Sequence, residues 1–167
     1  MTRTLRPDLL QLWPTWAAFP LFGLGVLAIG AQARDDAMII IGLGLLLVNL
    51  LIVVDHAYFT TLRIEHDALA FDSHFGLQHD RVAIGSVQRV DAKRYPAAHS
   101  GVSAPHLVVR GRTKTLKVNI KPYRLAGLRE LVETMRALNP AIEVDAFWSA
   151  VLAGQDPSTQ PVARSRW

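Results

Sequence analysis

Six histidines are the residues of this chain best suited to hold a metal ion or to move protons. No two of them are four residues apart, the spacing that places two imidazoles on one face of a zinc-binding helix, and no HExxH motif occurs. On a strand, Asp72 and His74 would share one face, with His79 in the following strand, but turn and surface histidines are the commoner outcome. We therefore expect no metal site. The six are His56, His66, His74, His79, His99 and His106.

Nucleophilic catalysis has no better support, because the chain has no cysteine and its serines lack the context of a catalytic serine. No pair of carboxylates marks an acid–base site. Gly101 and Gly111 are isolated, so they do not form a phosphate-binding glycine loop. The sequence predicts a protein that is not an enzyme and carries no cofactor. The serines in question are Ser73, Ser86, Ser100 and Ser103.

Positive charge is the chemical feature that rises above background. Between positions 79 and 124 the chain has ten basic residues against two aspartates. An anionic membrane surface attracts each suitably placed basic residue by ~1 kcal/mol. Four of these residues, near the ends of predicted strands, are candidates for binding a lipid or a protein partner: Lys93, Arg94, Arg112 and Lys114.

The same charges have a simpler interpretation, a solvated basic face that only satisfies the preference for positive residues on the cytoplasmic side of a membrane. Nucleic acid is not an expected partner, because aromatic residues do not alternate with the basic ones. Charge alone leaves the first two interpretations open.

Two long apolar stretches near the N-terminus would hold these basic residues close to a membrane. Residues 9–33 contain no charge and would reach roughly 37 Å as a helix, more than the ~30 Å hydrocarbon core of a bilayer. Residues 34–36 form a short external connector. Residues 37–55 follow, and their apolar part would reach roughly 27 Å. The short connector forces two antiparallel neighbours, so the sequence predicts a transmembrane hairpin.

The flanking charges predict the orientation of this hairpin. Arg3 and Arg6 lie in an N-terminal segment, residues 1–8, and many basic residues follow the second stretch, whereas the connector has one arginine and two aspartates. Basic flanks stay in the cytoplasm, so both termini are expected there. The alternative is a signal peptide cleaved after the A-x-A pattern at residues 31–33, but the first stretch is too long for a usual signal.

Contacts within the membrane are expected from small and polar residues. Several glycines lie in the two stretches, and Gly44 is a candidate for helix packing, although glycine is common in membrane helices without such a role. Asn49 is a second candidate, because an amide in hydrocarbon requires a hydrogen-bonding partner. It faces the other helix or a neighbouring protein, or else bonds its own backbone near the interface.

Beyond the hairpin, residues 56–139 have the pattern of a β domain closed by a helix. Alternating apolar residues predict short strands, the first two joined by a turn at His66–Asp67. From Pro122 onward apolar residues recur every three or four positions up to Leu138, which predicts an amphipathic helix. The predicted strands are 61–65, 68–72, 81–84, 87–94, 106–110 and 115–120.

The last part of the chain contains one more candidate helix. Residues 140–153 have the spacing of a short amphipathic helix, which either packs on the domain or lies in the membrane interface. Glu143 and Asp145 without a neighbouring lysine or arginine favour packing on the domain. Residues 154–167 are polar and contain proline, so a mobile tail is expected.

This order of features resembles the bacterial pleckstrin-homology-like (PH-like) membrane proteins, in which a transmembrane hairpin precedes a small β domain. The likeness lies in residues 61–71 and 81–90 and in the closing helix, and it covers most of residues 40–140. Ala68 stands where the family has a turn glycine. The resemblance implies a partly open barrel of about seven strands capped by the C-terminal helix, in the bacterial inner membrane, and it transfers no catalytic residue.

Two functions follow from the sequence. The first is a non-catalytic PH-like module, held at the cytoplasmic face by its hairpin, that binds anionic lipid headgroups or a protein partner. The second is an accessory or assembly subunit of a larger respiratory, photosynthetic or secretion complex. The expected partners are therefore membrane lipids and another membrane protein or a second copy of this chain.

Overall fold

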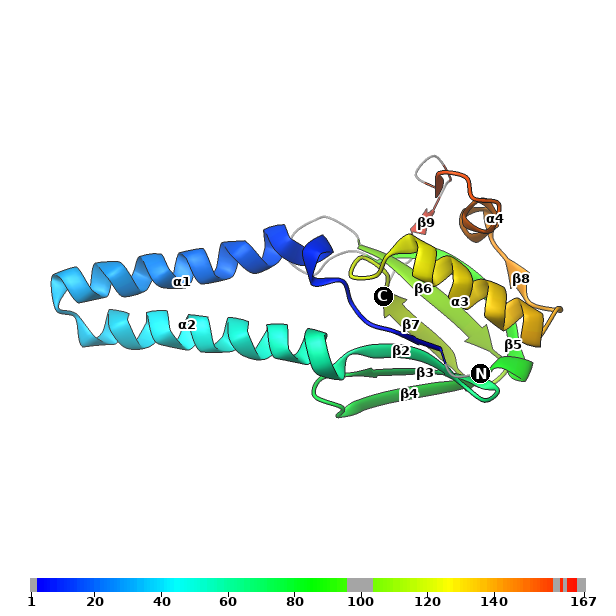
Figure 1. Ribbon diagram of the computed structural model, residues 1–167, viewed down its shortest axis with the longest axis horizontal. Coiled ribbons are helices and arrows are strands. Elements are labelled where there is room, and N and C mark those ends of the chain that lie inside the picture. Colours follow the sequence, from blue (N-terminus) through cyan, green and yellow to red (C-terminus); the bar gives the residue numbers. More distant parts are fainter. Residues whose placement is uncertain (1–2, 96–103, 158–159, 161, 165–167) are drawn as a thin grey trace.

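Figure 1 shows the computed structural model, which describes residues 3–95, 104–157, 160 and 162–164. A long pair of helices, α1 (Trp13–Ala33) and α2 (Asp36–Val54), projects from one end of a β domain. The domain carries two further helices, α3 (Leu125–Leu138) and α4 (Ala146–Leu152). A short 3₁₀ turn, η1 (Leu9–Leu12), leads into α1.

The two long helices lie side by side and run in opposite directions (Figure 1). The chain reverses at Arg34, whose φ of 54° is left-handed. The Asp35 carboxylate then accepts hydrogen bonds from the backbone N–H groups of Ala37 and Met38 at 3.0 and 3.2 Å. This caps the free N–H groups at the start of α2, so the connector needs no further residues.

Two glycines allow the helix backbones to approach each other. A Cβ atom on Gly30 would lie 2.8 Å from the backbone nitrogen of Ile39, and one on Gly42 would lie 2.8 Å from that of Leu27. Both distances are too short for a real side chain. The small residues therefore form the contact between α1 and α2, as they do where helices pack in lipid.

Large apolar side chains cover the outside of the pair. Phe22 is 65% exposed, Ile40 69% and Leu47 57%. Among the described residues, one helix is long and apolar enough to cross a membrane, Asp36–Phe59, while the apolar stretch Ala17–Ala33 is shorter.

Four antiparallel strands form the first sheet of the β domain. Successive strands of this sheet are neighbours, but the first of them comes from the N-terminus and pairs Arg3 with Ile64 across the sheet. The whole helix pair is thus inserted between two adjacent strands. The strands are β1 (Arg3–Leu5), β2 (Thr61–Glu65), β3 (Ala68–Ser73) and β4 (Gln78–Ala83).

A second sheet follows after the 3₁₀ turn η3 (Ile84–Ser86). Three antiparallel strands make its body, and two short strands from the C-terminal region pair in parallel with the outer edge of the first of them. The body is β5 (Val87–Tyr95), β6 (Ala104–Gly111) and β7 (Thr115–Asn119), and the short strands are β8 (Glu143–Val144) and β9 (Ala163–Arg164).

The core lies between the two sheets and under α3. Alternation puts Leu62 and Ile64 of β2 inside, each with 0% exposure, and the apolar face of α3 buries Leu131 and Met135 to the same degree. Trp148 of α4 is also fully buried in this core. The prediction that the second short helix packs on the domain is therefore confirmed.

The structure differs from the sequence predictions at the edges of the sheets. Residues 1–8 were expected to be a simple N-terminal segment, yet Arg3–Leu5 is a strand, because a three-residue edge strand shows no alternation to detect. Of the tail 154–167, Ala163–Arg164 pairs with β5, and residues 158–159, 161 and 165–167 lie outside the described residues. Strand pairing among the described residues gives two sheets and no closed barrel.

Candidate binding cleft at the helix–domain junction

No loop separates α2 from the β domain. α2 continues into a π-helical turn, η2 (Asp55–Phe59), in which the Thr60 backbone N–H donates to the Asp55 carbonyl at 2.8 Å, and β2 starts at Thr61. The Asp55 side chain is buried, and its Oδ1 atom accepts the backbone N–H of Phe75 at 2.5 Å. One carboxylate thus ties the end of α2 to the turn between β3 and β4.

The residues that precede α1 attach its start to the β domain. Leu5 packs directly on the backbone of α3, since a Cβ atom on Gly127 would lie 2.7 Å from Leu5 Cδ2. The Asp8 N–H donates to the Pro122 carbonyl at 2.6 Å, and Arg124 Nε donates to Asp8 Oδ2 at 2.5 Å. The hydrogen bond from Arg124 lowers the pKa of the Asp8 carboxyl. The start of α1 and the end of α2 are therefore both fastened to the domain.

A cleft of about 550 Å³ opens at this junction. It is bounded by η2, the helix-facing ends of β3 and β4, the end of β7 and the segment that leads into α3. Its lining combines apolar rings with histidine, lysine, amide and hydroxyl groups. The lining residues are Asp55, His56, Thr60, Phe71, Ser73, His74, Gln78, His106, Lys117, Asn119, Pro122 and Tyr123.

Two hydroxyl groups at the cleft are buried without a hydrogen-bonding partner among the described residues, those of Thr60 and Tyr123. Tyr123 is 4% exposed, and its burial raises the pKa of the phenol well above the usual range. The phenol therefore stays protonated and available as a donor. Buried hydroxyls normally find partners, so a bound water or ligand oxygen is the expected complement.

Ser73 and His74 are in contact in the cleft. Ser73 Oγ lies 2.9 Å from His74 Nδ1 and 3.1 Å from Gln78 Oε1, to which it donates. The arrangement is suited to holding polar groups, and the prediction that the protein is not an enzyme stays a prediction.

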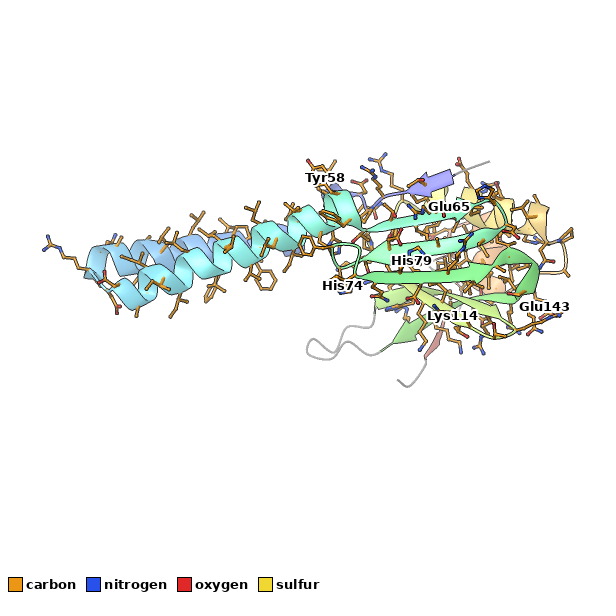
Figure 2. The ribbon with its side chains drawn as sticks, turned by 90° about the horizontal axis from the view of Figure 1, so that it is seen from below. Tyr58, Glu65, His74, His79, Lys114 and Glu143 are labelled. Carbon is orange, nitrogen blue, oxygen red and sulfur yellow. The ribbon has the colours of Figure 1, made fainter. Side chains whose placement is uncertain are left out.

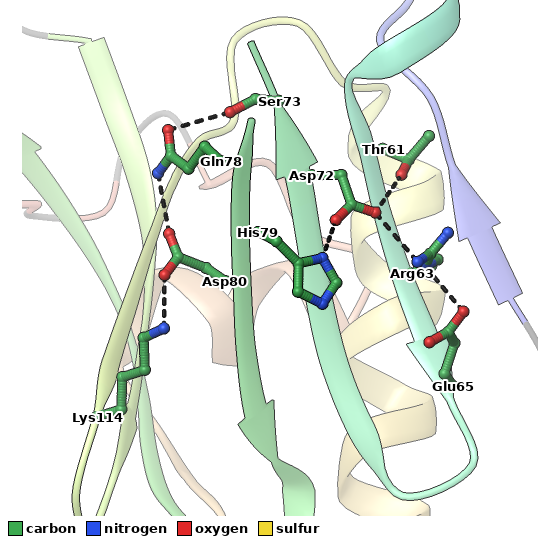
Figure 3. Close-up of polar contacts among 9 residues, drawn as sticks. All are labelled: Thr61, Arg63, Glu65, Asp72, Ser73, Gln78, His79, Asp80 and Lys114. Carbon is green, nitrogen blue, oxygen red and sulfur yellow. Dashed lines mark hydrogen bonds and ion pairs between the residues drawn. The ribbon is translucent and has the colours of Figure 1, made fainter. Parts of the chain in front are cut away.

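A chain of polar contacts runs from this serine along β4 (Figure 3). Gln78 Nε2 donates to Asp80 Oδ2 at 2.9 Å, and Lys114 Nζ donates to Asp80 Oδ1 at 2.6 Å. These two hydrogen bonds, chiefly that from Lys114, lower the pKa of Asp80. Lys114 is thus engaged in linking the edges of the two sheets, which sequence reasoning did not foresee.

The histidines are dispersed. His79 bonds Asp72, which also accepts from Thr61 at 3.3 Å and from Arg63 at 3.2 Å on the outer face of the first sheet (Figure 3). His74 lies apart from them in the turn at the cleft. The described residues include no group of three histidine or carboxylate ligands suited to a metal ion, and His99 lies outside those residues.

The four basic candidates do not form one patch. β5 and β6 are antiparallel, with Val87 opposite Gly111 at one end and Arg94 opposite Pro105 at the other. Lys93 and Arg94 therefore lie toward the helix pair. β6 ends at the far side of the domain from the helix pair (Figure 1). Arg112 follows its last residue, Gly111, and donates its N–H to the Ser86 carbonyl at 3.1 Å, and Lys114 lies in the same turn.

Of the two predicted helix-packing residues, Gly44 lies away from the close contact between the helices, whereas Asn49 follows Gly42 by seven residues, two turns along the same face of α2. A Cβ atom on Gly44 would meet nothing within 4 Å, so Gly44 faces outward, and Gly42 makes the contact in its place. Asn49 is half-buried on α2, and its amide forms no hydrogen bond with the described residues. Sequence reasoning also missed Asp55 and Tyr123, for which the only signals were an acid at the end of an apolar run and a lone aromatic after a proline.

Comparisons of the chain with protein-family models, with curated proteins and with solved structures each find no match.

Proposed function

We propose that this protein is a non-catalytic, membrane-anchored binding module. α1 and α2 cross the inner membrane of a bacterium as a hairpin, and the β domain at the cytoplasmic face binds anionic lipid headgroups or a protein partner. One observation carries this proposal: the exposed apolar surface of the helix pair ends where the polar cleft begins. Ile52 is 42% exposed, and the buried carboxylate of Asp55 follows three residues later.

The attachment of both helix ends supports the sidedness. Because β1 pairs with β2, the N-terminal strand and the β domain lie on the same side of any bilayer that the pair crosses. The connector at the opposite end contains Arg34 against Asp35 and Asp36, whereas the domain side is basic. This asymmetry favours a cytoplasmic domain. The role of β1 in the sheet also favours retention of the first helix over its removal as a signal peptide.

The architecture of the domain supports a PH-like fold. An antiparallel sheet and the three antiparallel strands β5–β7 of the second sheet are followed by α3, whose buried face closes the core with Leu128, Leu131 and Met135. A domain of this kind uses its strand ends and inter-sheet openings for binding. The cleft at the junction is such an opening, and it faces the level at which lipid headgroups would lie.

Basic residues near the helix pair are the favoured contacts for anionic headgroups. Lys93 and Arg94 lie toward the helices, whereas Arg112 lies at the opposite end of the domain, where it would meet the cytoplasm and an acidic protein partner. Lys114 is already paired with Asp80. The unpartnered hydroxyls of Tyr123 and Thr60 would complement oxygen atoms of a headgroup in the cleft.

Native mass spectrometry of the detergent-extracted protein tests this assignment. We expect the wild type to retain phosphatidylglycerol and the double variant Lys93→Glu/Arg94→Glu to retain at least several-fold less, because two attractive charges become repulsive. The matched control Arg112→Glu, at the far end of the domain, should leave lipid retention unchanged. Equal retention by all three proteins would remove the lipid assignment.

A second candidate function, an accessory subunit of a membrane complex, is favoured by the outer face of the helices. Gly25 and Gly44 both have open space where a Cβ would stand. Another transmembrane helix would fill that space.

Co-purification from native membranes in a mild detergent tests the second function. A stoichiometric partner that no longer co-purifies with Gly25→Leu and with Gly44→Leu, with both variants still inserted, would establish packing at this face. Gly85→Ala is a suitable control, because that glycine lies in the domain and also has open space at its Cβ position. Retention of the partner by both helix variants would exclude packing there.

A further inference from the structure

The turn between β3 and β4, His74–Leu77, presents apolar side chains to solvent. Leu77 is 88% exposed and Phe75 is 44% exposed. A side chain as apolar as Leu77 gains nothing from such exposure in water, and single exposed leucines are ordinary on protein surfaces. The position of this turn is what makes the exposure informative.

The turn lies beside the end of α2. The Phe75 ring packs against the Phe59 ring of η2, with centroids 5.3 Å apart and planes tilted by 52°. Figure 2 shows His74 in this turn and Tyr58 in η2 at the same end of the domain, where the helix pair leaves it. Tyr58 is itself 69% exposed. Through the Phe59–Phe75 contact, beside the polar cleft, apolar surface at the end of α2 therefore continues onto this turn.

The backbone of the turn is held in an unusual conformation. His74 and Phe75 have φ values of 53° and 56°, in the left-handed region, and Gly76 follows with 78°. Left-handed backbone is unfavourable for residues with a Cβ and persists where the surroundings enforce it. Here the Asp55 carboxylate enforces it by accepting the Phe75 N–H at 2.5 Å. The end of α2 thus fixes the direction of the turn.

The start of α1 adds a further exposed apolar residue near the base of the helix pair. Leu10, in η1 at the start of α1, is 77% exposed, and Phe59 at the end of α2 is 42% exposed. Aromatic and apolar residues therefore surround the base of the helix pair at the level where the helices meet the domain. Aromatic side chains favour this level at a membrane–water boundary.

We propose that the β3–β4 turn is a second membrane contact, in which Phe75 and Leu77 insert into the boundary between headgroups and acyl chains of the bilayer that α1 and α2 cross. This proposal rests on the proposed membrane anchoring. The occupant is the lipid interface because the patch is continuous with the apolar surface of α2. Insertion holds the first sheet close to the bilayer and places the cleft, whose lining includes Ser73, His74 and Gln78 beside this turn, at headgroup level.

The absence of cysteine allows a direct test in the full-length protein. Single cysteines at Leu77, at Leu47 in the middle of α2 and at Thr113 in the far turn are labelled with a nitroxide, and each protein is placed in nanodiscs of phosphatidylcholine and phosphatidylglycerol. Accessibility to apolar oxygen and to a water-soluble nickel chelate then gives the depth of each label. All three positions are exposed, so thermal unfolding of each variant should match that of the wild type.

We expect the Leu47 label to be deep, the Leu77 label to lie in the interface with at least several-fold less nickel accessibility than the Thr113 label, and the Thr113 label to be in water. A Leu77 label as accessible to nickel as that at Thr113, with Leu47 still deep, overturns the inference and leaves the anchoring intact. A Leu77 label shielded from both reagents overturns it in favour of a protein contact. Leu47 in water overturns the anchoring as well.

Discussion

The helix pair and the β domain place their large apolar side chains in opposite ways. In the helix pair large apolar residues point outward, with Ile40 69% exposed, while Gly30 and Gly42 make the contact inside. In the domain the order is reversed, and Leu62 and Leu131 are completely buried. The difference indicates that the two regions have different surroundings, because burial of apolar area stabilises a fold only where the alternative is water.

The largest expected effect comes from truncating the same residue type in each region. Leu131→Ala removes a fully buried side chain from the domain core and should lower the free energy of unfolding by about 2–5 kcal/mol. Leu47→Ala, on the outside of α2, should change it by much less, because no cavity forms within the protein. Thermal unfolding in a mild detergent measures both. Equal losses would mean that the outside of α2 is part of a protein core.

A smaller effect is expected from filling the contact between the helices. Gly42→Leu places a side chain against the backbone of Leu27 and should cost about 1–3 kcal/mol by overpacking. Gly44→Leu, two residues further along the same helix, has open space and should cost little within the isolated protein. A cysteine pair across the two helices, cross-linked in each variant, reports the separation. A cross-link that survives Gly42→Leu would show that the helices do not pack at this glycine.

The link between the two sheets predicts an acid-dependent contribution to stability. The hydrogen bond from Lys114 lowers the pKa of Asp80 in the folded protein, so the link stabilises the fold above the ordinary carboxyl pKa of about 4 and is lost as the pH falls through the lowered value. Because both groups are partly exposed, the contribution should be at most about 1 kcal/mol.

The variant Asp80→Asn measures this contribution. Its melting temperature should fall below that of the wild type at pH 7, and the difference should vanish near pH 2. Glu133→Gln serves as control for loss of one carboxylate, because Glu133 belongs to an exposed pair with Arg129 within α3. A difference that persists unchanged in acid would contradict the role of the Asp80 charge.

The smallest expected effect is at Tyr123. Its hydroxyl has no partner among the described residues, so Tyr123→Phe should leave the stability of the ligand-free protein unchanged or slightly raise it. Retention of phosphatidylglycerol should nevertheless fall if the phenol donates to a headgroup. A clear loss of stability on this substitution would show that the hydroxyl is already satisfied in the free protein.

Periodic patterns made most of the secondary structure predictable. Leu62 and Ile64 alternate, and Leu128 and Met135 recur on one helix face, so β2 and α3 lie where they were expected. The strand β1 was missed because three residues contain no period, and its pairing with β2 depends on a partner 57 residues or more away in the sequence. Because of the same separation in sequence, the insertion of the helix pair between β1 and β2 was not predicted either.

The candidate site was less predictable because it is assembled by tertiary contacts. The four basic candidates were chosen because they lie near predicted strand ends, but the antiparallel order of β5 and β6 places Arg94 and Arg112 at opposite ends of the domain. Asp55 gains its role only through the backbone of Phe75, and Tyr123 only through the cleft that forms around it. No local spacing encodes either relation.

The sidedness of the protein tests the account most directly. Single cysteines at Asp36, in the connector between the helices, and at Thr113, in the β domain, are exposed to a membrane-impermeant maleimide in intact cells whose outer membrane has been made permeable. We predict that the Asp36 cysteine is labelled at once and that the Thr113 cysteine is labelled only after the inner membrane is broken. Immediate labelling of both positions, or protection of both, would contradict a hairpin that holds the β domain at the cytoplasmic face.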